Sequence, residues 1–294
     1  MTLARKETRL ASNSFKELSD LEAQQLINSQ KIHILDVRTV QEYETLGHIP
    51  HSILCPVDWV ISVVASLPDD ETPLLVYCEH GVRSVSAASL ITQAGRKSVF
   101  NLTKGFSHWS GSREFSSTTP FGPWSPASWL IENADLITKP CDILDVACGQ
   151  GRNAILLAAA GMNVVAMDRD NQKLNTLSNR AARLGISLST VSIDLENDLV
   201  DLGSELYDII LVTHYLHRPL FPALIRALRS DGLLLYETFI QEQAKRGHPR
   251  NPCFLLKKGE LIDCVSPLKI LRQREGDFDN RLVSGIVAQK TDSS

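Results

Sequence analysis

Short apolar runs alternate with amphipathic stretches between residues 19 and 109. Ser19 and Glu22 stand three residues apart and form a capping box, which predicts that a helix begins there. We expect strands at 32–37, 74–77 and 98–102, with helices at about 58–66 and 84–93. Because strands and helices alternate, this half of the chain predicts an α/β domain whose sheet is largely parallel.

The pattern breaks between residues 113 and 127, where aromatic residues stand among prolines. Prolines stop regular structure and stiffen the chain, so this segment is typical of a linker. The prolines are Pro120, Pro123 and Pro126. We therefore expect two domains joined by a linker, at residues 15–112, 128–294 and 113–127 respectively.

The alternation of apolar and amphipathic stretches resumes after the linker. Strands are expected at 141–147, 163–167, 187–193, 207–212 and 232–239. Helices are expected at about 152–160, 171–184 and 221–229. The tail predicts a strand pair, 268–275 and 281–288, joined by a turn. The second domain is therefore also predicted to be α/β, with a strand hairpin at its end.

Composition removes several classes of protein. The chain has 294 residues, of which 43% are hydrophobic and 22% charged, with a net charge of −4 shared equally by the two halves. Neither half is a polycation, which argues against nucleic acid as a partner. The six cysteines form no C-x-x-C pair, so no metal site is predicted. No apolar run approaches the ~20 residues needed to span a membrane, and we expect a cytoplasmic protein with free thiols.

The expected strand at 74–77 runs directly into a loop that carries a cysteine. The loop reads Cys78-Glu79-His80-Gly81-Val82-Arg83, and a helix is expected to follow it. A thiol in this position faces backbone N–H groups without a partner in the helix, which favours a nucleophilic thiolate. Gly81 lets the loop turn, and Arg83 can either fix the curve or bind an anionic substrate. Cys78 and Arg83 are therefore the candidate catalytic residues.

Several motifs around this loop resemble, in order, those of the rhodanese domain. They are Asp36-Val37-Arg38, Glu42-Tyr43, Gly47-His48-Ile49-Pro50, the Cys-x-x-Gly-x-Arg loop and Gly105-Phe106-Ser107-His108-Trp109. The resemblance implies that Cys78 attacks a sulfane-sulfur donor, becomes a persulfide and passes the terminal sulfur to an acceptor. Tyrosine phosphatases use a similar loop with five residues between Cys and Arg, whereas this chain has four, a tighter ring that suits one sulfur better than a phosphate.

One residue of the loop departs from the pattern of active sulfurtransferases. Glu79 stands where many of them have a basic or neutral residue. A carboxylate there would oppose a thiolate and a dianionic donor such as thiosulfate. A donor of another kind, or a rhodanese-shaped module that does not transfer sulfur, are the two explanations. Asp36 and Arg38 are predicted to form an ion pair that supports the loop, and His80 to be part of its scaffold.

A second loop with chemical potential follows the expected strand at 141–147. Gly149-Gln150-Gly151 opens the next helix and fits the dinucleotide pattern G-x-G-x-x-A, so NAD is one candidate ligand. Asp145 would repel the pyrophosphate of a dinucleotide but suits an ammonium or a sulfonium, both of which S-adenosylmethionine carries. Asp168, 19 residues after Gly149, stands where a carboxylate commonly binds ribose.

From residue 128 onward the chain resembles class I S-adenosylmethionine-dependent methyltransferases. The turn at 145–153 looks like that of the tellurite-resistance and thiopurine branch, as do Tyr215-Leu216-His217-Arg218-Pro219-Leu220 and Leu235-Tyr236-Glu237-Thr238-Phe239. The resemblance implies a Rossmann-like sheet of seven strands with the final strand antiparallel. It implies contacts of the turn with the methionine part, of Asp168 with ribose, and of Asp194 and Leu195 with adenine. The expected cofactor-binding set is Asp145, Ala147, Gly149, Gly151, Asp168, Asp194, Leu195 and Thr213.

The segment Thr213-His214-Tyr215 is expected to line the pocket for the methyl acceptor, where His214 and Tyr215 either polarise the acceptor or serve packing. The basic stretch 245–258 is either an anion-recognising lid or a solvated loop. The sequence predicts a rhodanese-type domain fused to a methyltransferase. Its partners would be a sulfane-sulfur donor and a small methyl acceptor, such as a sulfur or other chalcogen nucleophile. The alternative is a methyltransferase regulated by a non-catalytic rhodanese-like module.

Overall fold

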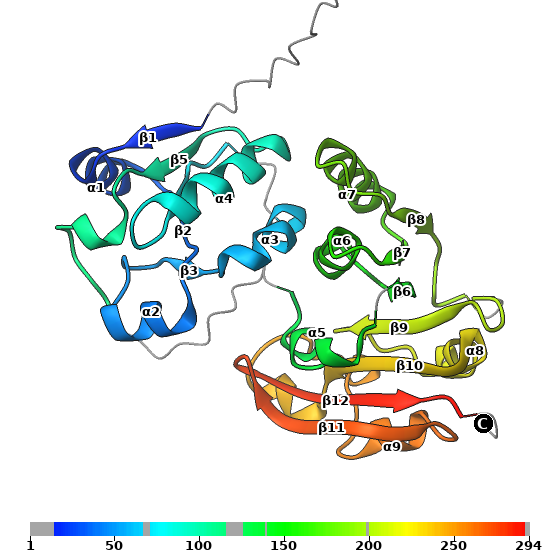
Figure 1. Cartoon of the computed structure of the whole chain (residues 1–294). Coiled ribbons are helices and arrows are strands. Elements are labelled where there is room, and N and C mark those ends of the chain that lie inside the picture. The colour runs from blue at the N-terminus through cyan, green and yellow to red at the C-terminus, as the bar shows by residue number, and fades with distance from the viewer. Residues whose placement is uncertain (1–14, 67–70, 116–125, 139, 198–199, 292–294) are drawn as a thin grey trace, which may run out of the picture.

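The computed structural model describes residues 15–66, 71–115, 126–138, 140–197 and 200–291, and these ranges form two α/β units with a sheet each (Figure 1). The predicted linker falls largely on residues 116–125, which lie outside the described residues. In the part of the chain that is described, the structure contains no helix that is both long enough and apolar enough to cross a bilayer.

The first sheet has five strands in the order β1-β5-β4-β2-β3, and every neighbouring pair is parallel. Its strands are β1 (Lys16–Leu18), β2 (His33–Asp36), β3 (Ile53–Leu54), β4 (Leu74–Tyr77) and β5 (Val99–Leu102). Its helices are α1 (Asp20–Ser29), α2 (Val40–Leu46), α3 (Val60–Ser66) and α4 (Val82–Gln93), with 3-10 turns at Val57–Trp59 and Phe106–His108. The three predicted strands and the parallel sheet are confirmed. β1 and β3 were missed because two or three residues show no periodicity.

The second sheet has seven strands in the order β11-β12-β10-β9-β6-β7-β8, all parallel except the last, β12. Its strands are β6 (Asp142–Val146), β7 (Asn163–Asp168), β8 (Ser189–Ser192), β9 (Tyr207–Thr213), β10 (Leu228–Phe239), β11 (Lys269–Phe278) and β12 (Arg281–Gln289). The implied seven-stranded sheet with an antiparallel final strand is confirmed. So is the hairpin, with β12 inserted between β10 and β11.

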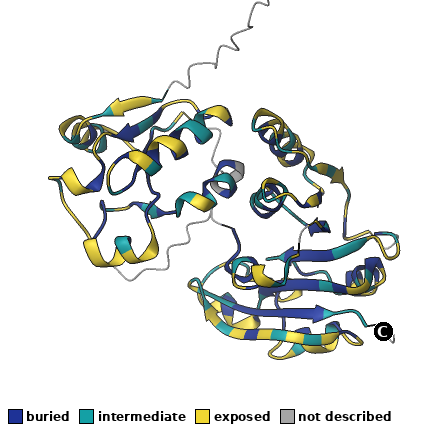
Figure 2. Cartoon of the chain, in the orientation of Figure 1, coloured by how far each residue is buried: buried dark blue, intermediate teal, exposed yellow. Residues whose placement is uncertain are grey.

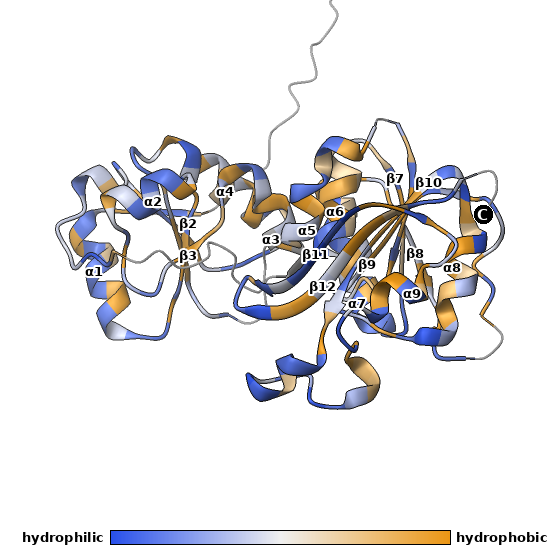
Figure 3. Ribbon diagram, turned by 90° about the horizontal axis from the view of Figure 1, so that it is seen from below, coloured by the Kyte–Doolittle hydropathy of each residue, from blue (hydrophilic) through white to orange (hydrophobic). Residues whose placement is uncertain are grey.

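Helices cover both faces of the second sheet. They are α5 (Ser128–Glu132), α6 (Arg152–Ala159), α7 (Asn171–Arg183), α8 (Phe221–Ala227) and α9 (Glu260–Cys264). Short 3-10 turns lie at Ala134–Leu136, Arg218–Leu220, Gln241–Lys245 and Pro252–Phe254. Figure 2 shows β9, β10 and β12 mostly buried, whereas the edge strand β11 alternates between exposed and covered positions. Figure 3 shows the same contrast in hydropathy, with apolar residues concentrated along the central strands.

Helix α3 of the first unit packs against α6 of the second (Figure 1). Ile61 contacts the core of the second unit, while Val60 and Val64 of the same helix belong to the core of the first. Ser62 is fully buried, and its hydroxyl donates a 2.6 Å hydrogen bond to the carbonyl oxygen of Arg152, the first residue of α6. Because α6 begins directly after the glycine turn, the first unit contacts the element that supports the second candidate site.

Candidate active sites

Cys78 lies at the carboxyl end of β4, in the loop that leads into α4. Its side chain is buried, and its Sγ accepts hydrogen bonds from the backbone N–H and the hydroxyl of Ser84, both at 3.4 Å. Ser84 lies in the first turn of a 12-residue helix, where backbone N–H groups have no partner within the helix. The sulfur therefore sits at the positive end of the α4 dipole, an arrangement that stabilises a negative charge on it.

A neighbouring turn holds the cysteine loop from behind. The N–H of Phe106 donates to the carbonyl oxygen of Cys78 at 2.8 Å, and the N–H of Ser107 donates to that of Glu79 at 3.0 Å. Gly105 has φ +67°, and a Cβ at this position would lie only 2.4 Å from the carbonyl oxygen of Cys78. The glycine of the Gly105–Trp109 motif is thus required by a close approach of two backbone segments.

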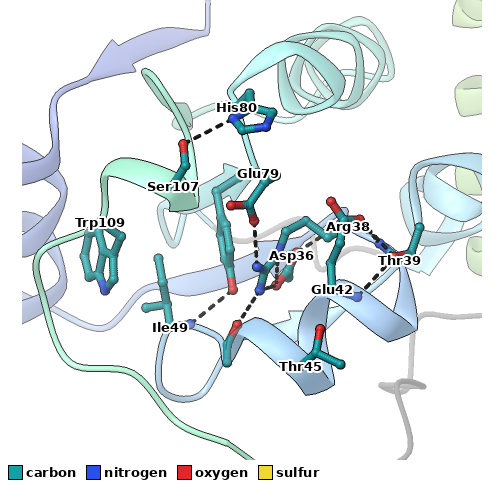
Figure 4. Close-up of polar contacts among 12 residues, drawn as sticks. Asp36, Arg38, Thr39, Glu42, Thr45, Ile49, Glu79, His80, Ser107 and Trp109 are labelled. Atoms are coloured by element: carbon teal, nitrogen blue, oxygen red, sulfur yellow. Dashed lines mark hydrogen bonds and ion pairs between the residues drawn. The ribbon is translucent and has the colours of Figure 1, made fainter.

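Two side chains brace the loop from either side. Arg83 forms two hydrogen bonds with Glu42 of α2, at 2.8 and 2.5 Å, and the pKa of Glu42 is lowered to about 2, chiefly by these bonds. The guanidinium of Arg83 therefore links α4 to α2. Of the two roles that the sequence left open for Arg83, this contact corresponds to fixing the curve of the loop rather than binding an anionic substrate. On the other side, the His80 ring lies 3.2 Å from the hydroxyl of Ser107 (Figure 4).

A buried ion pair supports the floor of the same loop (Figure 4). Arg38 and Asp36 are fully buried and share hydrogen bonds of 2.7 to 3.0 Å, which confirms the predicted pair. Arg38 also donates to Glu79 at 3.0 Å and to the carbonyl oxygen of Gly47 at 2.7 Å, and its guanidinium lies 4.1 Å from the centre of the Phe106 ring. Burial raises the pKa of Asp36, and the Arg38 contacts oppose that rise. The Glu79 side chain thus points to Arg38. The sequence motif alone did not predict this contact.

The second site is built around the turn between β6 and α6. The N–H of Gly149 donates to the carboxylate of Asp168, at the end of β7, over 2.8 Å. Gly149 and Gly151 both have positive φ, and a Cβ on Gly151 would collide with the Leu177 side chain of α7. Ala147 also adopts a positive φ of 52°, which is unusual for a residue with a side chain. The turn therefore carries its strain at the ligand-facing edge of the sheet.

A cavity of about 860 Å³ opens beside this turn, within the size range of pockets for small ligands. Five residues of the predicted cofactor-binding set line it: Ala147, Gly149, Asp168, Asp194 and Leu195. The other three do not line this cavity. Asp145 is buried beneath the turn, Gly151 packs on α7, and the Thr213 hydroxyl accepts a hydrogen bond from Asn153 at 3.2 Å. The structure thus brings together the ends of β6, β7 and β8, at residues 146, 168 and 192 of the sequence.

Asp145 is the least compensated charged group of this site. Its side chain is 1% exposed, and neither carboxylate oxygen has a hydrogen-bond partner among the described residues. Burial raises its pKa to about 7, and the nearby Ala154 N–H and Arg152 charge offset that rise only in part. A buried carboxylate without a partner is costly unless a cation approaches it. The site therefore fits a positively charged ligand better than an anionic one.

His214 also lines the cavity, stacked on Phe239 with 4.9 Å between ring centres. The Nδ1 atom of His214 lies 3.5 Å from a guanidinium nitrogen of Arg152, and its Nε2 lies 3.3 Å from one of Arg281. Burial first, and then these two positive charges, lower the pKa of His214 to about 3. The imidazole is thus neutral at physiological pH. Arg281 gave no signal in the sequence, because the hairpin brings it to the site from a distance. Phe239 belongs to a motif quoted above, but the sequence did not assign it to this site.

The basic stretch forms one wall of the cavity, through His248, Pro249, Arg250, Asn251 and Phe254. Arg218 holds this wall by donating to the carbonyl oxygens of Cys253 and Leu255 at 3.0 and 2.9 Å. The stretch is therefore a wall of the cavity, to which it contributes the guanidinium of Arg250. Arg246 instead pairs with Asp277 at 2.7 Å.

Comparison with known proteins divides the chain in the same way. Residues 19–112 match the family model of the rhodanese-like domain, and residues 126–235 match that of the tellurite resistance protein TehB. The thiosulfate sulfurtransferase GlpE of Coxiella burnetii is 36% identical over 95 residues, which are 32% of this chain and 87% of that protein. The first unit therefore resembles most of the length of this relative.

The relatives of the second unit are more distant. The probable S-adenosyl-L-methionine-dependent methyltransferase TehB of Haemophilus influenzae is 28% identical over 103 residues, which are 34% of this chain and 35% of that protein. The crystal structure of TehB from Haemophilus influenzae is similar with a TM-score of 0.50 and 19% identity, covering 58% of this chain and 65% of that one. The matches imply S-adenosylmethionine as the cofactor, and the unpartnered Asp145 and the open space at Gly149 fit it.

Proposed function

Since this chain belongs, through residues 19–112, to the rhodanese family and carries in residues 126–235 a TehB-like methyltransferase domain, both of them transferase families, we propose that it is a bifunctional transferase. The first domain transfers sulfur through a persulfide on Cys78. The second transfers a methyl group from S-adenosylmethionine to a small sulfur or other chalcogen nucleophile. The boundaries that we propose for these domains are residues 15–112 and 128–294.

The sulfur-transfer step uses the Cys78 thiolate as the nucleophile. It attacks the outer sulfur of a sulfane-sulfur donor, the sulfur–sulfur or equivalent bond of the donor breaks, and the remainder leaves with the bonding electron pair. Cys78 then carries a persulfide, whose outer sulfur is taken by a nucleophilic acceptor, and the thiolate is restored. The N–H and hydroxyl of Ser84 support this proposal, because they already donate to Sγ and stabilise its negative charge.

S-adenosylmethionine, when bound, supplies an electrophilic methyl group on a positively charged sulfur. Asp145 compensates the positive charge of the cofactor, and the absence of a hydrogen-bond partner for either of its carboxylate oxygens among the described residues is the observation that carries this half of the proposal. Asp168 binds the ribose hydroxyls with the carboxylate that the Gly149 N–H orients. Asp194 and Leu195, which also line the cavity, hold the adenine ring.

The methyl acceptor binds at the end of the cavity lined by His214 and Phe239. Two guanidinium groups, of Arg152 and Arg281, face the imidazole from either side and make this end positive. A positive field stabilises the anionic form of a thiol or selenol, which is the form that attacks a methyl carbon. The protein then contributes mainly alignment of nucleophile and methyl group and exclusion of water.

The two halves of the proposal are tested on the full chain. After incubation with a sulfane-sulfur donor, intact-mass measurement should show a gain of one sulfur atom, which is absent in Cys78→Ser. Calorimetry should show binding of S-adenosylmethionine with equal affinity to wild type and Cys78→Ser, and a labelled-methyl screen of thiols, sulfide and selenols identifies the acceptor. No mass gain in the wild type, with methyl transfer intact, would support a non-catalytic rhodanese-like module instead.

A further inference from the structure

The ion-paired side chains that brace the Cys78 loop have a negative balance. Arg83 is matched by Glu42, and Arg38 is matched by Asp36. Glu79 adds a third carboxylate to these two guanidinium groups, so the formal charge of the five groups is −1. Glu79 is the residue that makes this sum negative, and it directly follows Cys78 in the sequence.

The two guanidinium groups of this cluster are committed to the protein. Arg83 makes two hydrogen bonds to Glu42, and Arg38 is buried with donors turned to Asp36, Glu79 and the Gly47 carbonyl oxygen. Lys104 lies on the turn beside Gly81, but its side chain is exposed, where solvent and salt screen its charge. Within these ion pairs, Glu79 is therefore the carboxylate that has no guanidinium group of its own.

An exposed apolar side chain belongs to the same loop. Val82, the first residue of α4, stands between Gly81 and Arg83 and is 74% exposed. An exposed apolar group at an active-site rim favours the organic part of a substrate over a small inorganic dianion.

We propose that Glu79 determines donor specificity, so that the Cys78 site takes sulfur from an organic sulfane-sulfur compound of at most one negative charge and discriminates against thiosulfate. The inference rests on the proposed sulfur transfer. In the step, Cys78–S⁻ attacks the outer sulfur of R–SO₂–S⁻ or R–S–SH. The donor's sulfur–sulfur bond breaks, and the sulfinate or thiolate leaves with the electron pair. With R–S–SH the proton stays on the transferred sulfur or passes to the leaving thiolate.

Two donors that differ by one charge test this inference. Thiosulfate and methanethiosulfonate both give up the outer sulfur of an S–SO₂ unit, but the first is a dianion and the second a monoanion. The assay measures kcat/KM for each donor with cyanide as acceptor, in wild type and Glu79→Gln. Removing one unit charge at roughly 8 Å, with an effective dielectric constant of about 40, changes an equilibrium about sixfold per donor charge. The preference for methanethiosulfonate over thiosulfate should therefore fall about sixfold in Glu79→Gln.

The control variant Glu242→Gln changes the net charge equally, but in the other domain, and should leave the donor preference unchanged. Wild type supplies a second readout that needs no variant. Raising the ionic strength from about 0.05 to about 0.5 M should increase kcat/KM for thiosulfate more than for methanethiosulfonate, because salt screens the repulsion.

The outcomes distinguish a failure of the donor-specificity inference from a failure of the proposed sulfur transfer. Equal effects of Glu79→Gln on both donors, or a salt response that does not depend on donor charge, would overturn the specificity inference while sulfur transfer stands. If neither these donors nor glutathione persulfide adds a sulfur atom to wild-type Cys78, the proposed sulfur transfer itself fails, and the inference fails with it.

Discussion

The buried carboxylate of Asp145 makes the stability of the second domain depend on pH in a way that one substitution should remove. Its pKa is raised from 3.8 to about 7 by burial, a difference of roughly 3 units. When folding raises the pKa of an acid, its contribution to stability is fully present only below the pKa that it has in the unfolded chain. The contribution is lost as the pH rises through the pKa that it has in the folded protein. The window for Asp145 is therefore about pH 4 to 7.

The magnitude follows from about 1.4 kcal/mol per pKa unit. At pH 5 Asp145 is protonated in the folded protein but ionised in the unfolded chain, which lowers the free energy of unfolding by about 2 kcal/mol. At pH 8 the buried charge lowers it by about 4 kcal/mol. The neutral amide in Asp145→Asn has no such dependence. The free energy of unfolding of the variant, relative to wild type, should therefore increase by about 3 kcal/mol between pH 5 and pH 8.

Urea denaturation of the ligand-free protein at the two pH values measures this difference. Glu237, whose pKa burial also raises to about 7, titrates in both proteins and cancels in the comparison. The matched control is Asp263→Asn, which removes an exposed carboxylate of α9 and should show no such trend. A relative stability of Asp145→Asn that is the same at both pH values would refute the argument that a bare carboxylate is buried beneath the turn.

The same group links pH to cofactor binding. Only ionised Asp145 compensates a positively charged ligand, so the affinity for S-adenosylmethionine should fall up to tenfold per pH unit below about 7 and level off above it. Asp145→Asn should bind about tenfold or more weakly at pH 8 and lose the pH dependence. Calorimetry between pH 5.5 and 8.5 measures both effects. Equal affinities of the two proteins at pH 8 would show that Asp145 does not pair with the cofactor.

Three further substitutions test the geometry elsewhere. Gly105→Ala places a Cβ 2.4 Å from the Cys78 carbonyl oxygen at a positive φ and should abolish persulfide formation, measured by mass, without changing cofactor affinity. Ser62→Ala removes the buried hydrogen bond to Arg152 and should lower the free energy of unfolding by about 1 kcal/mol in urea denaturation. Arg281→Gln removes one of the positive charges that face the His214 ring, so the pKa of that imidazole should rise above about 3 in an NMR titration; an unchanged value would contradict the contact.

The sequence predicted those site features that depend on local order along the chain. Cys78 and Asp168 stand directly at strand ends, so reading the strands was sufficient to locate them. The direction of a side chain could not be predicted from the sequence. Glu79, for example, points to the guanidinium of Arg38, which lies 41 residues away in the chain. Arg281 was missed for a related reason, because it reaches the cavity only when β12 is inserted next to β10. Long-range strand pairing leaves no trace in a local pattern.

The contact between α3 and α6 also affects how the two units would behave as separate polypeptides. Ile61 packs against the core of the opposite unit, and Leu184 packs in return against the core that contains Cys78. Two polypeptides cut at the proline-rich stretch would each present this apolar patch to water. We expect such halves to aggregate or to re-associate when mixed, so that covalent fusion here supplies a high effective concentration for surfaces that are already complementary.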